Sequence, residues 1–144
     1  MSEPIENAVI KSSPLLSFIL VVRGDGDRLE TTITSLIVAH QSVNLTIQIL
    51  MVGINLTPRG EERCCLATHR YFNTDWLQVS ASSEAVLLNT AVTLARGQWI
   101  WFLEAGDELE RDAISCWNGL RLNNPDILLF AADGQHLDGT HVPV

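Results

Sequence analysis

Two acidic side chains, Glu104 and Asp107, lie near the end of the segment of the chain that is best suited to chemistry. Residues 95–109 (ARGQWIWFLEAGDEL) run from a helix end, through a glycine, into a very apolar strand. The strand delivers both carboxylates to its carboxyl end, and in an open α/β sheet ligands bind at that edge. Carboxylates placed there are what a divalent cation bound to phosphates requires. The segment therefore predicts a metal-dependent nucleotide site, or the remains of one.

A second interpretation of the same segment needs no ligand. Gly106 would supply a positive φ to a strand-end turn, and Asp107 would cap the helix that follows. Trp99 and Trp101 alternate along the strand, so they share one of its faces. Stacking on a sugar is one use of such a face, but we favour packing against a helix.

The pattern of apolar residues predicts the elements that position this segment. Apolar runs of strand length lie at residues 15–22, 45–52, 75–79, 98–103 and 126–131. Helices are predicted at residues 29–40, 58–71, 83–94 and 110–122, with Pro58 in the first turn of the second and Ser82 or Ser83 capping the third. The predicted fold class is therefore α/β: a mostly parallel open sheet with helices on both faces, as in Rossmann-like folds.

The length of 144 residues fits a single domain. Residues 1–13 are polar and lack periodicity, so we expect a flexible leader there. Residues 14–133 are expected to form the α/β domain. Residues 134–144 follow as a tail without clear structure.

Composition excludes several classes of function. The net charge is −8, and the nine Lys and Arg residues are scattered, so no basic stripe is available for a nucleic acid. Three cysteines cannot form a disulfide framework, and we expect buried or half-buried helix thiols in a reducing, cytoplasmic compartment. The longest apolar run is too short for a transmembrane segment, and the N-terminus lacks the pattern of a signal peptide.

Several segments share the spacing of one enzyme family. Residues 16–29 (LSFILVVRGDGDRL) match the pattern V-S-I-I-V-P-V-Y-N-x-x-x-x-L, and residues 47–55 (IQILMVGIN) fall on I-E-I-I-V-V-D-D-G. Asn89 falls on the Asn of A-R-N, and residues 95–109 fall on A-x-G-x-Y-I-x-F-L-D-x-D-D-x-L. In this order the segments resemble the N-terminal half of an inverting, family-two glycosyltransferase with the GT-A fold. The resemblance implies the half that binds a nucleotide-sugar donor.

The chain departs from the family at the positions that carry chemistry. The Asp pair after the second strand, of which the first typically holds uracil, falls on Gly53 and Ile54. The Arg of A-R-N falls on Leu88, and the first-turn aromatic falls on Arg23. In the D-x-D motif the second Asp, the usual direct metal ligand, falls on Gly106. Losing a hydrogen bond to a charged group costs about 1.5–3 kcal/mol, so these departures indicate relaxed or repurposed function.

The resemblance nevertheless implies a set of candidate site residues. Donor binding would fall to Arg23, Asp25 and Asn89, and Mn²⁺ or Mg²⁺ would be held by Glu104 and Asp107. Arg23 would meet a phosphate or a carboxylate, and the alternative is an ion pair with a nearby Asp. Asp25 is otherwise a solvated turn residue, and Asn89 an ordinary helix residue.

We expect a glycosyltransferase-like domain of hexosyltransferase type whose catalytic residues are unknown. The acceptor pocket and catalytic base of the family belong to a further half, so this chain alone is expected to be inactive. The alternative is a non-catalytic scaffold or interaction domain that kept the fold, with an exposed apolar patch or a homodimer. A third hypothesis is a domain that binds a different nucleotide.

Overall fold

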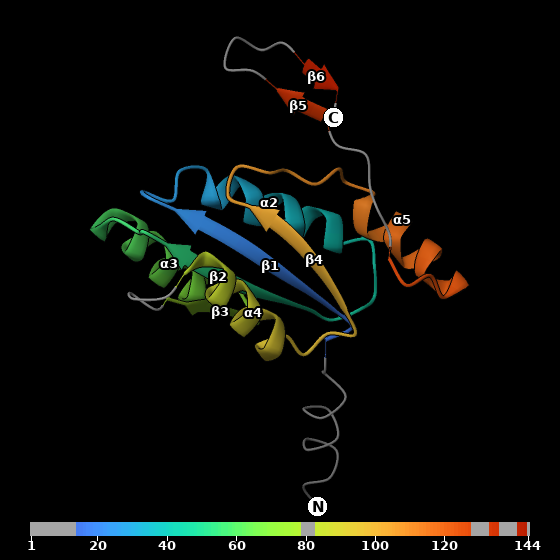
Figure 1. Cartoon of the computed structure of the whole chain (residues 1–144). Helices are drawn as coiled ribbons and strands as arrows, with labels where there is room; N and C mark the ends of the chain where they lie inside the picture. Colours follow the sequence, from blue (N-terminus) through green and yellow to red (C-terminus); the bar gives the residue numbers. More distant parts are fainter. Residues whose placement is uncertain (1–13, 79–82, 128–132, 136–140, 144) are drawn as a thin grey trace, which may run out of the picture.

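A computed structural model describes residues 14–78, 83–127, 133–135 and 141–143 (Figure 1). Its main feature is a sheet of four parallel strands in the order β3-β2-β1-β4. The strands are β1 (Leu16–Arg23), β2 (Ile47–Ile54), β3 (Thr74–Leu77) and β4 (Trp99–Glu104). The parallel sheet and its helices confirm the predicted fold class.

Three helices connect the four strands, and a fourth described helix follows β4. They are α2 (Leu29–His40), α3 (Pro58–Arg70), α4 (Glu84–Leu94) and α5 (Ala113–Leu120), the last continued by a 3₁₀ turn, η1 (Arg121–Asn123). The Thr57 side chain caps α3 by accepting from the Gly60 N–H, and Ser83 caps α4 by accepting from the Val86 N–H. The predicted start of the last helix, at residue 110, is wrong. Residues 110–112 form a turn, closed by a 3.0 Å bond from the Ala113 N–H to the Glu110 carbonyl.

Two predictions concern the end of the chain. The strand predicted at residues 126–131 lies mostly outside the described residues, and Asp126 and Ile127, which are described, are not in a strand. We predicted no regular structure after residue 133. There the described residues form β5 (Asp133–Gln135) and β6 (His141–Pro143), which pair antiparallel. The leader predicted at residues 1–13 lies outside the described part.

Alternate residues of β1 face two separate apolar cores. Leu16, Phe18, Leu20 and Val22 belong to a core that includes buried residues of α2, α3 and α5. Ile19 and Val21 join a smaller core with α4, which covers the opposite face of the sheet (Figure 1). Helices therefore lie on both faces, as the sequence predicts.

The two tryptophans of β4 pack into the larger core. Trp99 meets Trp117 of α5 edge-on with ring centroids 6.1 Å apart, and Trp101 lies against Phe18 at 5.5 Å. Aromatic pairs in such geometries add to the free energy gained by burying their surface. The interpretation of Trp99 and Trp101 as core residues is confirmed.

A buried polar cluster joins three strands at the amino edge of the sheet. The Ser17 hydroxyl donates to Gln48 Oε1 (2.7 Å) and accepts from the Gly97 N–H (2.9 Å). Gln48 Oε1 also accepts from the Arg96 N–H at 2.9 Å. Ser17 and Gln48 are register partners and are almost fully buried. Their bonds attach the segment leading into β4 to the two central strands.

Candidate functional site

The candidate site is built on Arg23, the last residue of β1, at the carboxyl edge of the sheet. Its guanidinium forks onto the Glu84 carboxylate, with Nη2–Oε1 at 2.5 Å and Nη1–Oε2 at 3.2 Å. Its Nε donates to Glu104 Oε1 at 3.2 Å. Glu104 ends the neighbouring strand β4, and Glu84 begins α4 on one face of the sheet. We call Arg23, Glu84 and Glu104 the edge triad.

The charges of the edge triad stabilise one another. The hydrogen bonds to Glu84 and then to Glu104 raise the pKa of Arg23, which keeps its positive charge at any physiological pH. The same contact with Arg23 lowers the pKa of Glu84. All three side chains are about half exposed, so the triad can be reached from solvent. The sequence placed Arg23 against a phosphate, a carboxylate or a nearby Asp. The structure gives it two glutamates from distant elements.

The loop after β4 folds back onto the end of the strand. Asp107 Oδ2 accepts from the Glu104 N–H at 2.8 Å, and the Asp107 N–H donates to the Glu104 carbonyl at 2.9 Å. Gly106 has a φ of 109°, which confirms the predicted positive φ at this turn. The prediction that Asp107 caps the next helix is wrong, because its carboxylate bonds within the turn and α5 begins only at Ala113.

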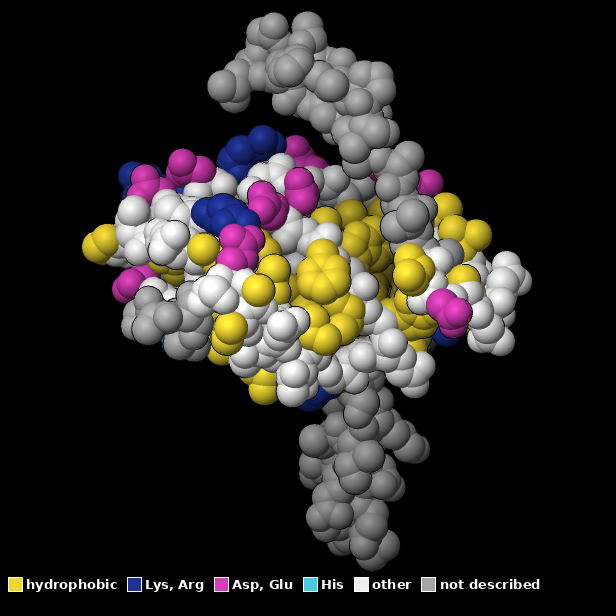
Figure 2. Space-filling view, viewed as in Figure 1, with side chains coloured by type: hydrophobic (Ala, Val, Ile, Leu, Met, Phe, Trp, Pro, Cys, Tyr) yellow, Lys and Arg dark blue, Asp and Glu magenta, His cyan; other side chains and the backbone are white. Residues whose placement is uncertain are grey.

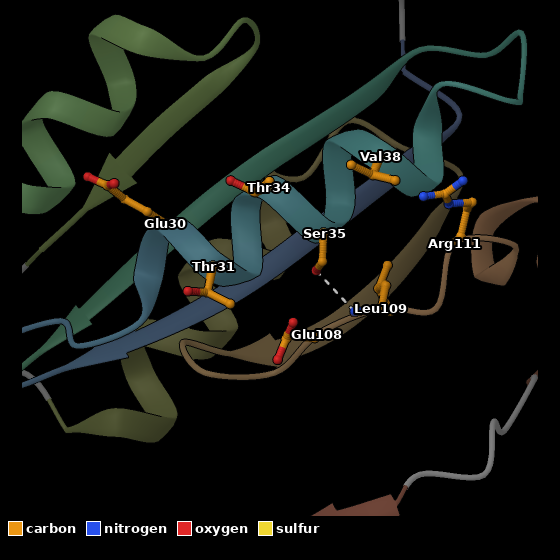
Figure 3. A pocket seen from close by; sticks show the side chains of 8 residues that line it. All are labelled: Glu30, Thr31, Thr34, Ser35, Val38, Glu108, Leu109 and Arg111. Carbon is orange, nitrogen blue, oxygen red and sulfur yellow. Dashed lines mark hydrogen bonds between the residues drawn. The ribbon is translucent and has the colours of Figure 1, made fainter.

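Two hydroxyl groups of α2 hold this loop in place. Thr32 Oγ1 accepts from the Gly106 N–H at 2.8 Å, and Ser35 Oγ accepts from the Leu109 N–H at 3.0 Å. The second bond crosses an open groove of about 450 Å³ between α2 and the loop (Figure 3). The predicted site residues do not line this groove. Within the groove, Ser35 holds the loop in position through Leu109. Glu104 and Asp107 are not among the residues that line the groove.

Glu104 and Asp107 suit a divalent cation poorly in this arrangement. One oxygen of each carboxylate already accepts a hydrogen bond from the protein, from Arg23 for Glu104 and from a backbone N–H for Asp107. The positive guanidinium 3.2 Å from Glu104 would repel a second cation. Within the described ranges, His, Cys, Asp and Glu side chains form no group of three or more that could hold a metal. Binding of Mn²⁺ or Mg²⁺ stays a prediction.

Asp25 is held in a different way from Arg23. Its Oδ1 accepts from the Thr57 hydroxyl at 2.5 Å, and its carbonyl accepts from Arg63 Nη1 at 3.1 Å. Thr57 and Arg63 belong to the start of α3, so this turn is attached to α3 and not to β4. The neighbouring Gly24 carbonyl accepts from the Thr57 N–H at 3.0 Å. Asp25 is exposed at the same edge of the sheet but outside the edge triad.

Asn89 and Leu88 lie further along α4. The Asn89 side chain is exposed, about one and a half turns after Glu84. Leu88, at the position of the family's Arg, packs partly buried against the smaller core. The structure therefore brings together Arg23, Glu104 and, through its turn, Asp107, and places Asn89 on the helix that Glu84 begins.

The two residues at the position of the family's Asp pair are closely packed by neighbouring side chains. A Cβ on Gly53 would lie 2.5 Å from Leu56 Cδ1 and 3.0 Å from Trp76 Nε1. Ile54 is buried in the smaller core. A side chain at position 53 would therefore require the Leu56 side chain to shift.

Sequence reasoning missed Glu84. It stands directly after the capping Ser83, in the first turn of a helix that follows a strand. In parallel α/β folds such helices begin at the same edge where the strands end. That rule would have placed Glu84 at the carboxyl edge of the sheet, although not beside Arg23 in particular.

Comparison with known proteins extends the fold assignment. No protein-family model matches the chain, and no curated protein sequence matches it. Solved structures of S. aureus TarS, a family-two glycosyltransferase of the GT-A fold, do match. One TarS structure aligns with a TM-score of 0.65 at 15% sequence identity. The alignment covers 89% of this chain and 23% of the TarS chain.

Two matching structures hold ligands. TarS 1–349 in complex with UDP-GlcNAc aligns over 75% of this chain, with a TM-score of 0.63 and 13% identity. The complex with UDP aligns over 87% of this chain, with a TM-score of 0.63 and 14% identity. This chain spans 31% and 43% of those two chains. The likeness confirms the predicted GT-A-like fold.

Two further observations concern membrane-spanning helices and the cysteines. Among the described helices, none combines the length and apolar character needed to cross a bilayer. All three cysteines are free, with Cys64 buried and Cys65 and Cys116 exposed. The prediction of buried or half-buried thiols thus holds for Cys64 and is wrong for the other two.

Proposed function

We propose that this chain is a glycosyltransferase-like domain that binds a nucleotide sugar at the carboxyl edge of its sheet. We also propose that it does not transfer the sugar by itself. The edge triad is the observation that carries the proposal, because it places a permanent cation where a GT-A-like fold would receive a diphosphate. The likeness to TarS supports the ligand class, since TarS has been solved with UDP-GlcNAc and with UDP. A cytoplasmic location fits the three free thiols.

Calorimetry with UDP-GlcNAc and UDP tests the donor-binding proposal directly. Arg23→Gln is expected to weaken binding about tenfold or more, because a hydrogen bond to a charged phosphate is lost. Arg70→Gln is the matched control, since Arg70 pairs with Glu30 on the surface at 3.8 Å and lies outside the edge triad. No heat from the wild-type chain at millimolar ligand would refute the proposal.

The base of the nucleotide is a separate question. The family's Asp pair falls on Gly53 and Ile54, so the chain lacks the side chains that hold uracil in the family. A thermal-shift screen across uridine, guanosine, adenosine and cytidine diphosphates tests this point. Equal shifts are expected if the diphosphate alone is recognised, and a preference for another base would favour the hypothesis of a different nucleotide.

A second candidate function rests on an exposed apolar residue. Phe102 is 56% exposed on β4, which is the end strand of the described sheet. Figure 2 shows apolar side chains gathered over β4 and toward α5. Such a patch suits a scaffold or interaction domain, with a homodimer as the simplest assembly. Light scattering should then show a dimer that Phe102→Ser dissociates and Leu66→Ser, a control at 54% exposure on α3, leaves intact. A strictly monomeric chain would contradict this candidate.

A further inference from the structure

We propose that Arg23 takes the place of the divalent cation at this site, so that a nucleoside diphosphate binds here without a metal. The inference concerns the charge chemistry of the edge triad and, for its ligand, rests on the proposed function. It starts from a disagreement: the resemblance implies Mn²⁺ or Mg²⁺ held by Glu104 and Asp107, and the side chains present are arranged otherwise.

The first argument is the geometry around Arg23. Three guanidinium nitrogens contact two carboxylates from different elements, at 2.5, 3.2 and 3.2 Å. A planar fork of this kind matches carboxylates and phosphates, and its charge cannot be removed near neutral pH. Glu84 and Glu104 therefore already have a cation between them. Both oxygens of Glu84 and one oxygen of Glu104 accept from Arg23, so a divalent ion would have to displace that cation to bind the two carboxylates together.

The second argument is the backbone at the usual ligand position. Gly106 stands where the family has its second Asp, and its φ of 109° is one that residues with a side chain rarely adopt. The Thr32 hydroxyl holds that conformation through the Gly106 N–H at 2.8 Å. The turn is thus shaped for glycine, and an Asp ligand cannot be restored there without strain. Gly106 at the ligand position and Arg23 between the two glutamates therefore both disfavour a metal ion here.

The third argument is exposure. The Arg23 side chain is 46% exposed, so its guanidinium can turn from a glutamate toward an incoming diphosphate. Glu84 competes with that ligand because it accepts two of the three hydrogen bonds. Removing the Glu84 charge should therefore strengthen diphosphate binding.

Titration of Mn²⁺ alone tests the cation replacement without any nucleotide. The wild-type chain should show no binding at millimolar Mn²⁺. Arg23→Gln leaves Glu84 and Glu104 without a cation, so its Mn²⁺ affinity should rise on the order of tenfold or more. Arg23→Lys, which keeps the charge, should behave like wild type, and Arg70→Gln is the surface control. Equal Mn²⁺ affinity in wild type and Arg23→Gln, including no binding by either, would overturn the proposal.

Titration of UDP in EDTA and in Mn²⁺ tests the second half of the inference. Equal affinity in the two buffers is expected, with a gain of about threefold or more for Glu84→Gln and a loss for Arg23→Gln. Circular dichroism confirms that each variant is folded. UDP binding that requires Mn²⁺ would overturn metal-independent binding but leave donor binding standing. No UDP binding in either buffer would refute donor binding itself, while the Mn²⁺ titration would still decide the role of Arg23.

Discussion

Replacing Gly60 with alanine should destabilise the fold, although helix propensity alone predicts the opposite. Gly60 lies in the first turn of α3, where Ala would favour the helix by up to about 1 kcal/mol. A Cβ at this position would lie 2.1 Å from the Gly24 carbonyl oxygen and 3.1 Å from Leu56 Cδ2. The first neighbour is backbone, which cannot rotate away, so the start of α3 must move.

The magnitude follows from three contributions to the free energy of unfolding. Overpacking costs about 1–3 kcal/mol. Moving α3 also weakens the 3.0 Å hydrogen bond from the Thr57 N–H to the Gly24 carbonyl, which contributes about 1 kcal/mol. The gain in helix propensity offsets about 1 kcal/mol of this. Gly60→Ala should therefore lower the free energy of unfolding by about 1–3 kcal/mol.

Urea unfolding followed by tryptophan fluorescence measures the change, since the chain has four tryptophans. Gly119→Ala is the matched control, because Gly119 is a helical glycine whose Cβ would meet nothing within 4 Å. It should stabilise the fold by about 0.5–1 kcal/mol. If Gly60→Ala is as stable as wild type while Gly119→Ala is stabilised, the close approach of α3 to Gly24 is refuted.

Three further predictions concern other parts of the chain. Ser17→Ala should destabilise the fold by about 1–3 kcal/mol in the same urea assay, because it leaves the Gly97 N–H without its 2.9 Å acceptor. An unchanged urea midpoint would contradict a stabilising role of the polar cluster. Burial raises the pKa of the Cys64 thiol to about 11. At pH 8 a thiol reagent should therefore react quickly with the two exposed cysteines and with Cys64 only on unfolding. Three fast-reacting thiols would show that Cys64 is accessible. The pKa of Glu84 is lowered in the fold, so its contribution to stability is present above its unfolded pKa and is lost as the pH falls through the folded value. Carboxyl NMR should show that lowered pKa in wild type and a return toward the ordinary value in Arg23→Gln, and a value unaffected by Arg23→Gln would contradict the ion pair.

The elements of the fold were predictable because the two central strands are buried on both faces. Strands such as β1 and β2 have nearly every residue buried, and they appear in the sequence as continuous apolar runs. Local signals also marked two helix starts: Pro58 in the first turn of α3 and Ser83 as the cap of α4. The start of α5 was missed because its N-cap residue, Asp112, makes no side-chain capping bond and the preceding residues form a turn.

The site was predictable only in part. Glu104 and Asp107 follow an apolar strand, so their place at the carboxyl edge could be inferred from periodicity. The partners of Arg23 could not, because Glu84 and Glu104 are 61 and 81 residues away in sequence. Their meeting depends on which strand lies beside β1 and on which face α4 packs, and tertiary packing decides both. The role of Gly106 was inferred correctly since positive φ is a local preference of glycine.

The buried cluster of Ser17 and Gln48 has a consequence for how such a chain can evolve. The hydrogen bonds that attach the segment before β4 to β1 and β2 lie at the amino edge of the sheet. Arg23 and Glu104 lie at the opposite edge, where β1 and β4 end. Substitutions of the half-exposed side chains of Arg23 and Glu104 therefore leave these buried hydrogen bonds in place. Ligand-contacting residues can drift, disappear or be redesigned there while the strand order is preserved. Such a fold can be kept while its ligand-binding residues change, and it can therefore serve as a framework for a different binding site.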